Sequence, residues 1–134
     1  MPMMNAREYE ESLRKLGMRV YMFGRRVENV VDDPIIRPSM NAVAATYEYA
    51  HRPEYEDIMT AKSHLTGKKI NRFTHIHQST EDLVKKSKMG RLLGSLTACC
   101  FQRCVGMDAL NALSITTHAI DAKYGTGYYQ RFLK

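Results

Sequence analysis

The chain has 134 residues, 44% of them hydrophobic, which is enough for one ordinary domain with an apolar core. No apolar run approaches the roughly 18 residues of a membrane span, and residues 1–15 do not resemble a signal peptide. The three cysteines crowd into one short run, unlike a secreted disulfide framework. We therefore expect a cytoplasmic protein without a membrane partner.

The formal net charge of +6 fits a solvated basic surface, an anionic ligand or a nucleic acid. Acidic residues interleave with the basic ones, and no stripe of Arg and Lys alternates with aromatic residues. We therefore expect no nucleic-acid partner. A nucleic-acid-binding module stays as an alternative, which binding that weakens steeply with salt would support.

Helical periodicity predicts a first helix over Asn5–Leu16. A β-hairpin is predicted over Arg19–Val30, where β-forming residues flank Gly24-Arg25. Glycine in the first central position is typical of a type II′ turn, which would place Met22 opposite Val27.

Ser39 is predicted as the N-cap of a helix over about Met40–Ala50. Pro53 fits the first turn of a short helix that ends near residue 59. The next stretch is the least regular: Gly67 indicates a turn, and Ile70–Ile76 is compatible with an extended segment.

Acidic residues after Ser79 predict a helix start there, and that helix runs through Leu93. A final helix is predicted from about Ala98 to Tyr124, ended by the glycines that follow it. The fold class expected from these elements is mainly α, with one small β-hairpin.

Cys100 and Cys104 lie four residues apart, within about 40° of each other on a helix, so their thiolates can share a metal or a cluster. The spacing alone favours two small buried residues instead, because C-x3-C is a weak metal motif. His118 lies on the same face but about 21 Å along the helix. His75 and His77 alternate as in a strand, and nothing in the sequence brings either one to the cysteines.

Several stretches of the chain carry a resemblance more specific than these motifs. They are Ser12–Leu16, Arg19–Gly24, Ile35–Ser39, His77–Leu83 and Cys100–Ala109. Together they resemble the 4-hydroxyphenylacetate 3-hydroxylase family of flavoproteins, and within it the branch of 4-hydroxybutyryl-CoA dehydratases and vinylacetyl-CoA isomerases. The resemblance runs over nearly the whole chain but covers only the N-terminal domain, because proteins of this family are much longer.

The resemblance implies a radical dehydratase (a lyase) that converts 4-hydroxybutyryl-CoA to crotonyl-CoA in 4-aminobutyrate metabolism, with FAD and a [4Fe–4S] cluster as cofactors. Cys100 and Cys104 match two of the cluster ligands, whose other members are a cysteine and a histidine beyond this chain. Gln102 matches a polar residue of the site region, although a regular helix would turn it away from the cysteines. Cys99 is additional to the family pattern and has no assigned role.

On this basis residues 1–134 are expected to be the N-terminal helical domain of an acyl-CoA dehydrogenase-like flavoprotein, without its FAD-binding middle and C-terminal domains. The full-length enzyme would bind an acyl-CoA and form a homotetramer, whereas the chain alone is expected to lack activity and a stable cluster. The alternative is the N-terminal domain of a flavin-dependent hydroxylase. The cysteine pair, and the absence of a tyrosine found there in hydroxylases, favour the dehydratase.

Overall fold

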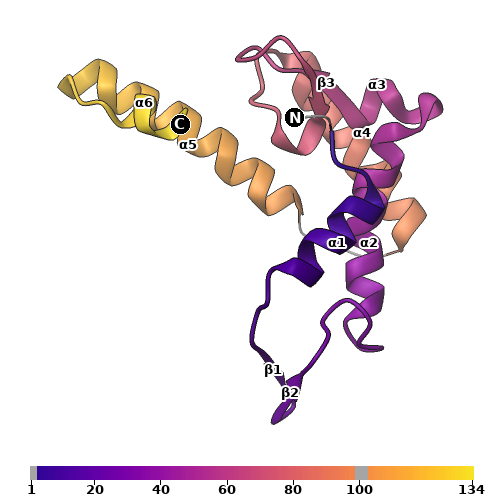
Figure 1. Cartoon of the computed structure of the whole chain (residues 1–134). Helices are drawn as coiled ribbons and strands as arrows, with labels where there is room; N and C mark the ends of the chain where they lie inside the picture. The colour runs from indigo at the N-terminus through magenta and orange to yellow at the C-terminus, as the bar shows by residue number, and fades with distance from the viewer. Residues whose placement is uncertain (1–2, 99–102) are drawn as a thin grey trace.

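The computed structural model of the chain describes residues 3–98 and 103–134. The fold is mainly helical, as the sequence predicts, and Figure 1 shows α1 and α2 side by side while α5 and α6 project as an arm. The α-helices are α1 (Ala6–Lys15), α2 (Arg37–Glu48), α3 (Glu56–Met59), α4 (Thr80–Thr97), α5 (Arg103–Tyr124) and α6 (Tyr128–Phe132). The 3-10 helices are η1 (Tyr49–His51), η2 (Pro53–Tyr55) and η3 (Arg72–Thr74).

The first hairpin forms where predicted, but its turn lies one residue earlier. Strands β1 (Val20–Met22) and β2 (Arg25–Val27) pair with Met22 opposite Arg25, so the predicted pairing of Met22 with Val27 is wrong. The turn residues Phe23 and Gly24 both have positive φ, at 51° and 75°. Positive φ at both central positions is typical of a type I′ turn, whose twist matches that of the paired strands. The predicted type II′ turn therefore does not form. Phe23 takes a left-handed conformation that is unfavourable for its residue type.

Helix α2 begins at Arg37, so the prediction that Ser39 caps a helix starting at Met40 is wrong. The Asp33 carboxylate organises the preceding turn by accepting the N–H of Ile35 at 2.9 Å. The Asp33 carbonyl then accepts the N–H of Arg37 at 2.8 Å. Pro38 fits in the first turn, where a missing N–H costs nothing.

The region predicted to be irregular contains a second hairpin. Its strands β3 (Thr60–Lys62) and β4 (Lys69–Asn71) pair antiparallel. The turn predicted at Gly67 lies in the connecting loop, where Gly67 takes a positive φ. Strands of three residues are too short to show alternation in sequence. The extended segment predicted over Ile70–Ile76 is only partly correct, because η3 interrupts it.

The helix start predicted at Ser79 is confirmed: Ser79 is the N-cap of α4, and its Oγ accepts the N–H of Asp82 at 3.3 Å. At the other end, Ala98 caps α4 in a left-handed conformation with φ of 51°. The predicted helix from Ala98 is therefore wrong at its start: its described part, α5, begins at Arg103 and ends at Tyr124 as predicted. Helix α6, which the sequence analysis did not predict, folds back on α5.

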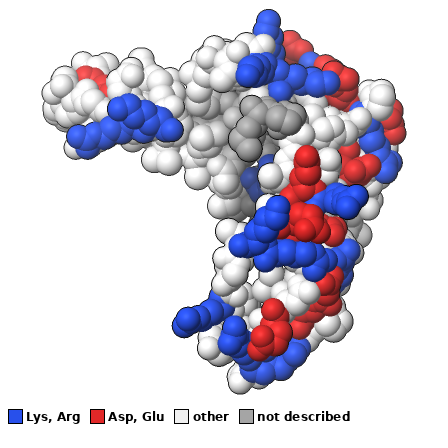
Figure 2. All heavy atoms as spheres, in the orientation of Figure 1, with Lys and Arg blue, Asp and Glu red and all other residues white. Residues whose placement is uncertain are grey.

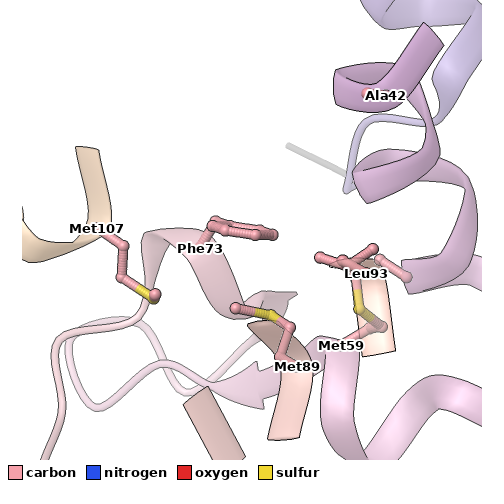
Figure 3. Close-up of a cluster of buried hydrophobic side chains, with 7 residues drawn as sticks. Ala42, Met59, Phe73, Met89, Leu93 and Met107 are labelled. Atoms are coloured by element: carbon pink, nitrogen blue, oxygen red, sulfur yellow. The ribbon is translucent and has the colours of Figure 1, made fainter. Parts of the chain in front are cut away.

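Three methionines lie at the centre of the main core cluster. Met59 of α3, Met89 of α4 and Met107 of α5 are at most 2% exposed, and they pack with Phe73 and Leu93 (Figure 3). Unbranched thioether side chains fill irregular gaps between short elements that do not align in regular layers. A smaller cluster of Val31, Met40 and Ala44 holds α1 against α2.

Across residues 3–98 and 103–134, none of the helices combines the length and apolar composition that crossing a membrane requires. Figure 2 shows Lys and Arg side chains intermingled with Asp and Glu over most of the visible face, whereas the arm formed by α5 and α6 carries less charge. Several of these charges pair, for example Arg14 with Asp32 at 2.6 Å. The visible basic residues thus form no single-sign stripe.

Candidate functional site

The predicted cysteine site lies at the beginning of α5. Cys104 is the second residue of this helix, and its side chain is a half-buried free thiol. Cys100 and Gln102, and also Cys99, lie outside the described residues, so the predicted approach of Cys100 to Cys104 stays a prediction.

Arg103, directly before this cysteine, makes the contacts that attach the start of α5 to the body of the domain. Its guanidinium lies over the rings of Tyr47 at 4.2 Å and Phe73 at 4.5 Å. Nη1 donates a hydrogen bond of 2.6 Å to Thr46 Oγ1. Tyr9 of α1 stacks on Tyr47 with 4.7 Å between the ring centroids. Residues of α1, α2, η3 and α5 therefore meet around one cation, which we call the Arg103 stack (Tyr9, Tyr47, Phe73 and Arg103).

About two turns further on, Asn111 fixes α5 to the loop that precedes α4. Its Oδ1 accepts the N–H of His77 at 2.8 Å, and its Nδ2 donates to the carbonyl of His75 at 3.2 Å. Lys86 of α4 pairs with Asp108 of α5. Because these contacts follow Cys104 within about two helical turns, they define the direction in which the cysteine-bearing end of α5 points.

The histidines do not join the cysteine. His75 and His77 lie in the loop after η3, so the predicted strand alternation is wrong, and their ring centroids are 6.1 Å apart. His118 packs edge-on against Tyr129 of α6 at 5.3 Å. Burial, together with the positive charge of Lys86, lowers the pKa of His77 below its usual range. Within the described residues no group of three or more His, Cys, Asp and Glu side chains is arranged to hold a metal ion.

A cleft of about 930 Å³ lies beside η3, β3 and the start of α4. Its charged side chains already pair with one another: Lys69 with Glu56 at 3.0 Å, and Lys85 with Asp57 at 2.5 Å and Glu81 at 3.1 Å. The cleft therefore leaves few free charges for a ligand.

Arg72, which the sequence analysis did not single out, is 3% exposed at the base of this cleft. Its Nε donates to the Ile58 carbonyl at 2.7 Å, and Nη2 donates to the carbonyls of Thr60 at 2.5 Å and Asp57 at 3.1 Å. Nη1 lies 3.3 Å from Asp82 Oδ1. One side chain thus ties the end of α3, the start of β3 and the first turn of α4 together.

Asp82 makes the stability of the fold depend on pH in the acidic range. Burial alone would raise the pKa of this carboxyl, but the N–H of Gln78 and the ring of His75 hydrogen-bond to it and hold its pKa at about 2. A carboxyl with a lowered folded pKa stabilises the protein fully above its unfolded pKa of 3.8. That contribution is lost as the pH falls from there through about 2.

We therefore expect the free energy of unfolding to decrease between these two pH values, measured by urea unfolding at a series of pH. The Asp82→Asn variant should be less stable at neutral pH and show a flatter decrease. An equally steep decrease in that variant would contradict the assignment to Asp82. The next candidate would then be the exposed Asp32, whose pKa is also about 2 because Arg14 hydrogen-bonds to it.

Comparison of the sequence with known proteins identifies the family of this chain. A family profile described as "4-hydroxyphenylacetate 3-hydroxylase N terminal" matches residues 5–134. The chain belongs to the 4-hydroxyphenylacetate 3-hydroxylase family. Within this family it is 64% identical over 97% of its length to the 4-hydroxybutyryl-CoA dehydratase/vinylacetyl-CoA-Δ-isomerase of Clostridium aminobutyricum. The chain spans only 26% of that protein, so it corresponds to about a quarter of its relative.

Solved structures in the family show the same relationship. An oxygen-tolerant archaeal 4-hydroxybutyryl-CoA dehydratase from N. maritimus superposes with a TM-score of 0.91 and 54% identity, over 96% of this chain and 25% of that one. The oxygenase component of a 4-hydroxyphenylacetate 3-monooxygenase, complexed with FAD, gives a TM-score of 0.60 and 25% identity over 69% of this chain and 19% of its own. The fold is thus shared with both branches and is more similar to the dehydratase.

Proposed function

We propose that this chain is the N-terminal part of a 4-hydroxybutyryl-CoA dehydratase that also isomerises vinylacetyl-CoA. The observation that carries the proposal is the 64% identity, over nearly the whole chain, to the Clostridium protein of that name. Because the chain spans a quarter of that relative, the activity belongs to the longer polypeptide, and the chain alone has none. The finer proposals are an acyl-CoA dehydrogenase-like overall fold, a homotetramer, and a place in 4-aminobutyrate and 4-hydroxybutyrate metabolism.

The proposed substrate explains why unusual cofactors are needed. Conversion of 4-hydroxybutyryl-CoA to crotonyl-CoA removes a proton from C3, which is β to the thioester carbonyl and therefore not acidic. When bound, FAD would supply one-electron chemistry and a [4Fe–4S] cluster would supply a Lewis-acidic iron for the departing hydroxyl. A related oxygenase component has been solved with FAD, which supports the flavin part of the proposal.

The residues of this chain fit a partial ligand set for the cluster. Cys104 of α5 offers a free, half-buried thiol, and thiolate sulfur is the ligand type that iron–sulfur clusters use. Cys100 would be the second ligand, and the remaining two would come from the longer polypeptide. Gln102, between them in sequence, is proposed to line the site. The contacts of Arg103 and Asn111 would hold Cys104 in place while the other ligands bind the cluster.

The deciding experiment is an anaerobic assay of the full-length protein with 4-hydroxybutyryl-CoA, following crotonyl-CoA formation and bound iron together. We expect turnover with about four irons per subunit, as one cluster requires. The isolated chain, assayed in parallel, should give no product and hold no stoichiometric iron. Absence of both product and iron in the full-length protein would contradict the proposal, and a hydroxylase activity would then be tested with 4-hydroxyphenylacetate and reduced flavin.

A further inference from the structure

Helix α5 has an apolar side that the rest of residues 3–98 and 103–134 leaves exposed. Val105, Leu113 and Ile115 on this side are 67%, 54% and 71% exposed. Between Asp108, which pairs with a lysine of α4, and Asp121 the helix contains no Asp, Glu, Lys or Arg, the residues that a solvated helix face carries. Figure 1 shows this part of α5 projecting from the body, with α6 folded against it. Such a surface indicates a missing neighbour.

The exposed side of α5 is wider than one neighbouring helix can cover. At about 100° per residue, Leu113 and Ile115 lie about 160° apart around the helix axis, and Val105 lies midway between them. Apart from the paired Asp108, the exposed residues that fill this arc are small and uncharged: Ala109, Ala112, Thr116 and Ala119. The opposite side is occupied, because Met107 packs in the core and α6 lies against the later turns. A helix normally buries a stripe of about 100° against its neighbour, so this arc fits two neighbouring helices.

The side chains of the arc define the chemistry of these neighbours. The alanines at its centre allow another helix to approach closely, and the larger Leu113 and Ile115 at its flanks would fill the grooves on either side. A charged group placed there would lose its hydration without gaining an opposite charge from α5. The neighbours must therefore present aliphatic or aromatic side chains.

The longer polypeptide can supply such neighbours. This chain spans 26% of the Clostridium relative and 25% of the archaeal structure, so about three quarters of each protein lies outside the matched residues. One α5 helix from a second copy would cover one stripe and leave the other flank in water. We propose that apolar helices from the rest of the polypeptide pack on both flanks of α5 and make it a central helix of the full-length protein. The inference rests on the proposed function, under which this chain is the N-terminal part of the enzyme.

The test is hydroxyl-radical footprinting of the native full-length protein, read by mass spectrometry at Leu113 and Ile115. The same peptides, oxidised after digestion at an equal radical dose, give the unprotected rate. We expect both residues to react at least about tenfold more slowly in the native protein, whereas their exposure of 54% and 71% would by itself slow them less than about twofold. Rates close to those of the digest would overturn the inference. Slowing at one flank only, or slowing that disappears when the protein is diluted to monomers, would assign the face to a second copy and also overturn it.

Glutamate substitutions give an independent measurement. Leu113→Glu and Ile115→Glu should each lower the melting temperature of the full-length protein by about 5 °C or more, because each buries an unpaired charge. Leu65→Glu is the matched control, since Leu65 is similarly exposed, at 52%, between β3 and β4. It should leave the melting temperature within about 1 °C of wild type, and equal melting temperatures in the three variants would overturn the inference. If the α5 variants do not fold, the footprint of the wild type decides.

Failure of this inference is distinguishable from failure of the proposed function. A full-length protein that buries both flanks of α5 but neither forms crotonyl-CoA nor binds iron would contradict the proposed function alone. A full-length protein with both properties and a digest-like footprint would contradict this inference alone.

Discussion

Replacing Arg72 by methionine is expected to lower the free energy of unfolding by about 3–5 kcal/mol, as for other variants that remove one partner of a buried ion pair. The substitution leaves three backbone carbonyls, of Asp57, Ile58 and Thr60, without the donor that Arg72 provides. It also leaves the partly buried Asp82 carboxylate without its cation. Each loss removes a favourable charge-assisted hydrogen bond and keeps the cost of burial.

The measurement is urea unfolding followed by circular dichroism, compared with Arg91→Met, which removes an exposed arginine from α4. That control should change the free energy of unfolding by less than about 0.5 kcal/mol. If Arg72→Met does not fold, Asp82→Asn gives a milder form of the same test because it removes only one partner. A loss below about 1 kcal/mol in Arg72→Met would show that water replaces these contacts, contrary to the buried network described here.

Replacing Cys104 by alanine in the full-length protein is expected to abolish cluster binding and dehydration together. The loss of activity should exceed about 100-fold, since even groups that only support a metal ligand cost 10- to 100-fold. Cys100→Ala should behave in the same way, because both thiolates are proposed ligands. Iron and sulfide content, the cluster absorption and crotonyl-CoA formation are measured on the same anaerobic sample.

Cys99→Ala is the matched control, because Cys99 belongs to the same run and has no assigned ligand role. It should keep its iron and its activity. If Cys104→Ala retained full iron content, Cys104 would be a packing residue, and the cluster ligands would have to be sought elsewhere in the longer polypeptide. If Cys99→Ala lost iron while Cys100→Ala kept it, the two neighbouring cysteines would exchange roles.

The parts of the fold that sequence analysis predicted correctly are those specified by neighbouring residues. Ser79 caps α4 because its side chain needs only the backbone three residues away. Two of the errors occur where one residue takes a conformation that its type disfavours. Phe23 and Ala98 both have φ of 51°, which moves the hairpin turn by one residue and ends α4 where a helix was predicted to begin.

The candidate site was predictable only in its cysteines. Cys104 follows from the resemblance of its run to a family motif, and the structure shows it as a free, half-buried thiol in α5. Arg103 is adjacent to it, but its partners Tyr47 and Phe73 lie far away in the chain. The burial of Arg72 likewise depends on the carbonyls at the end of α3. Such contacts follow from the tertiary fold and have no local signal.

Oxidation of the buried methionines can report which part of the domain opens. Met59, Met89 and Met107 come from three different helices, and each is at most 2% exposed, so peroxide reaches their sulfurs only when the surrounding packing separates. Conversion to the sulfoxide makes a side chain polar and blocks its return to the core. Mass spectrometry after brief oxidation would therefore show which helix detaches first, with sulfoxide at Met107 alone marking release of α5 from a domain that is otherwise closed.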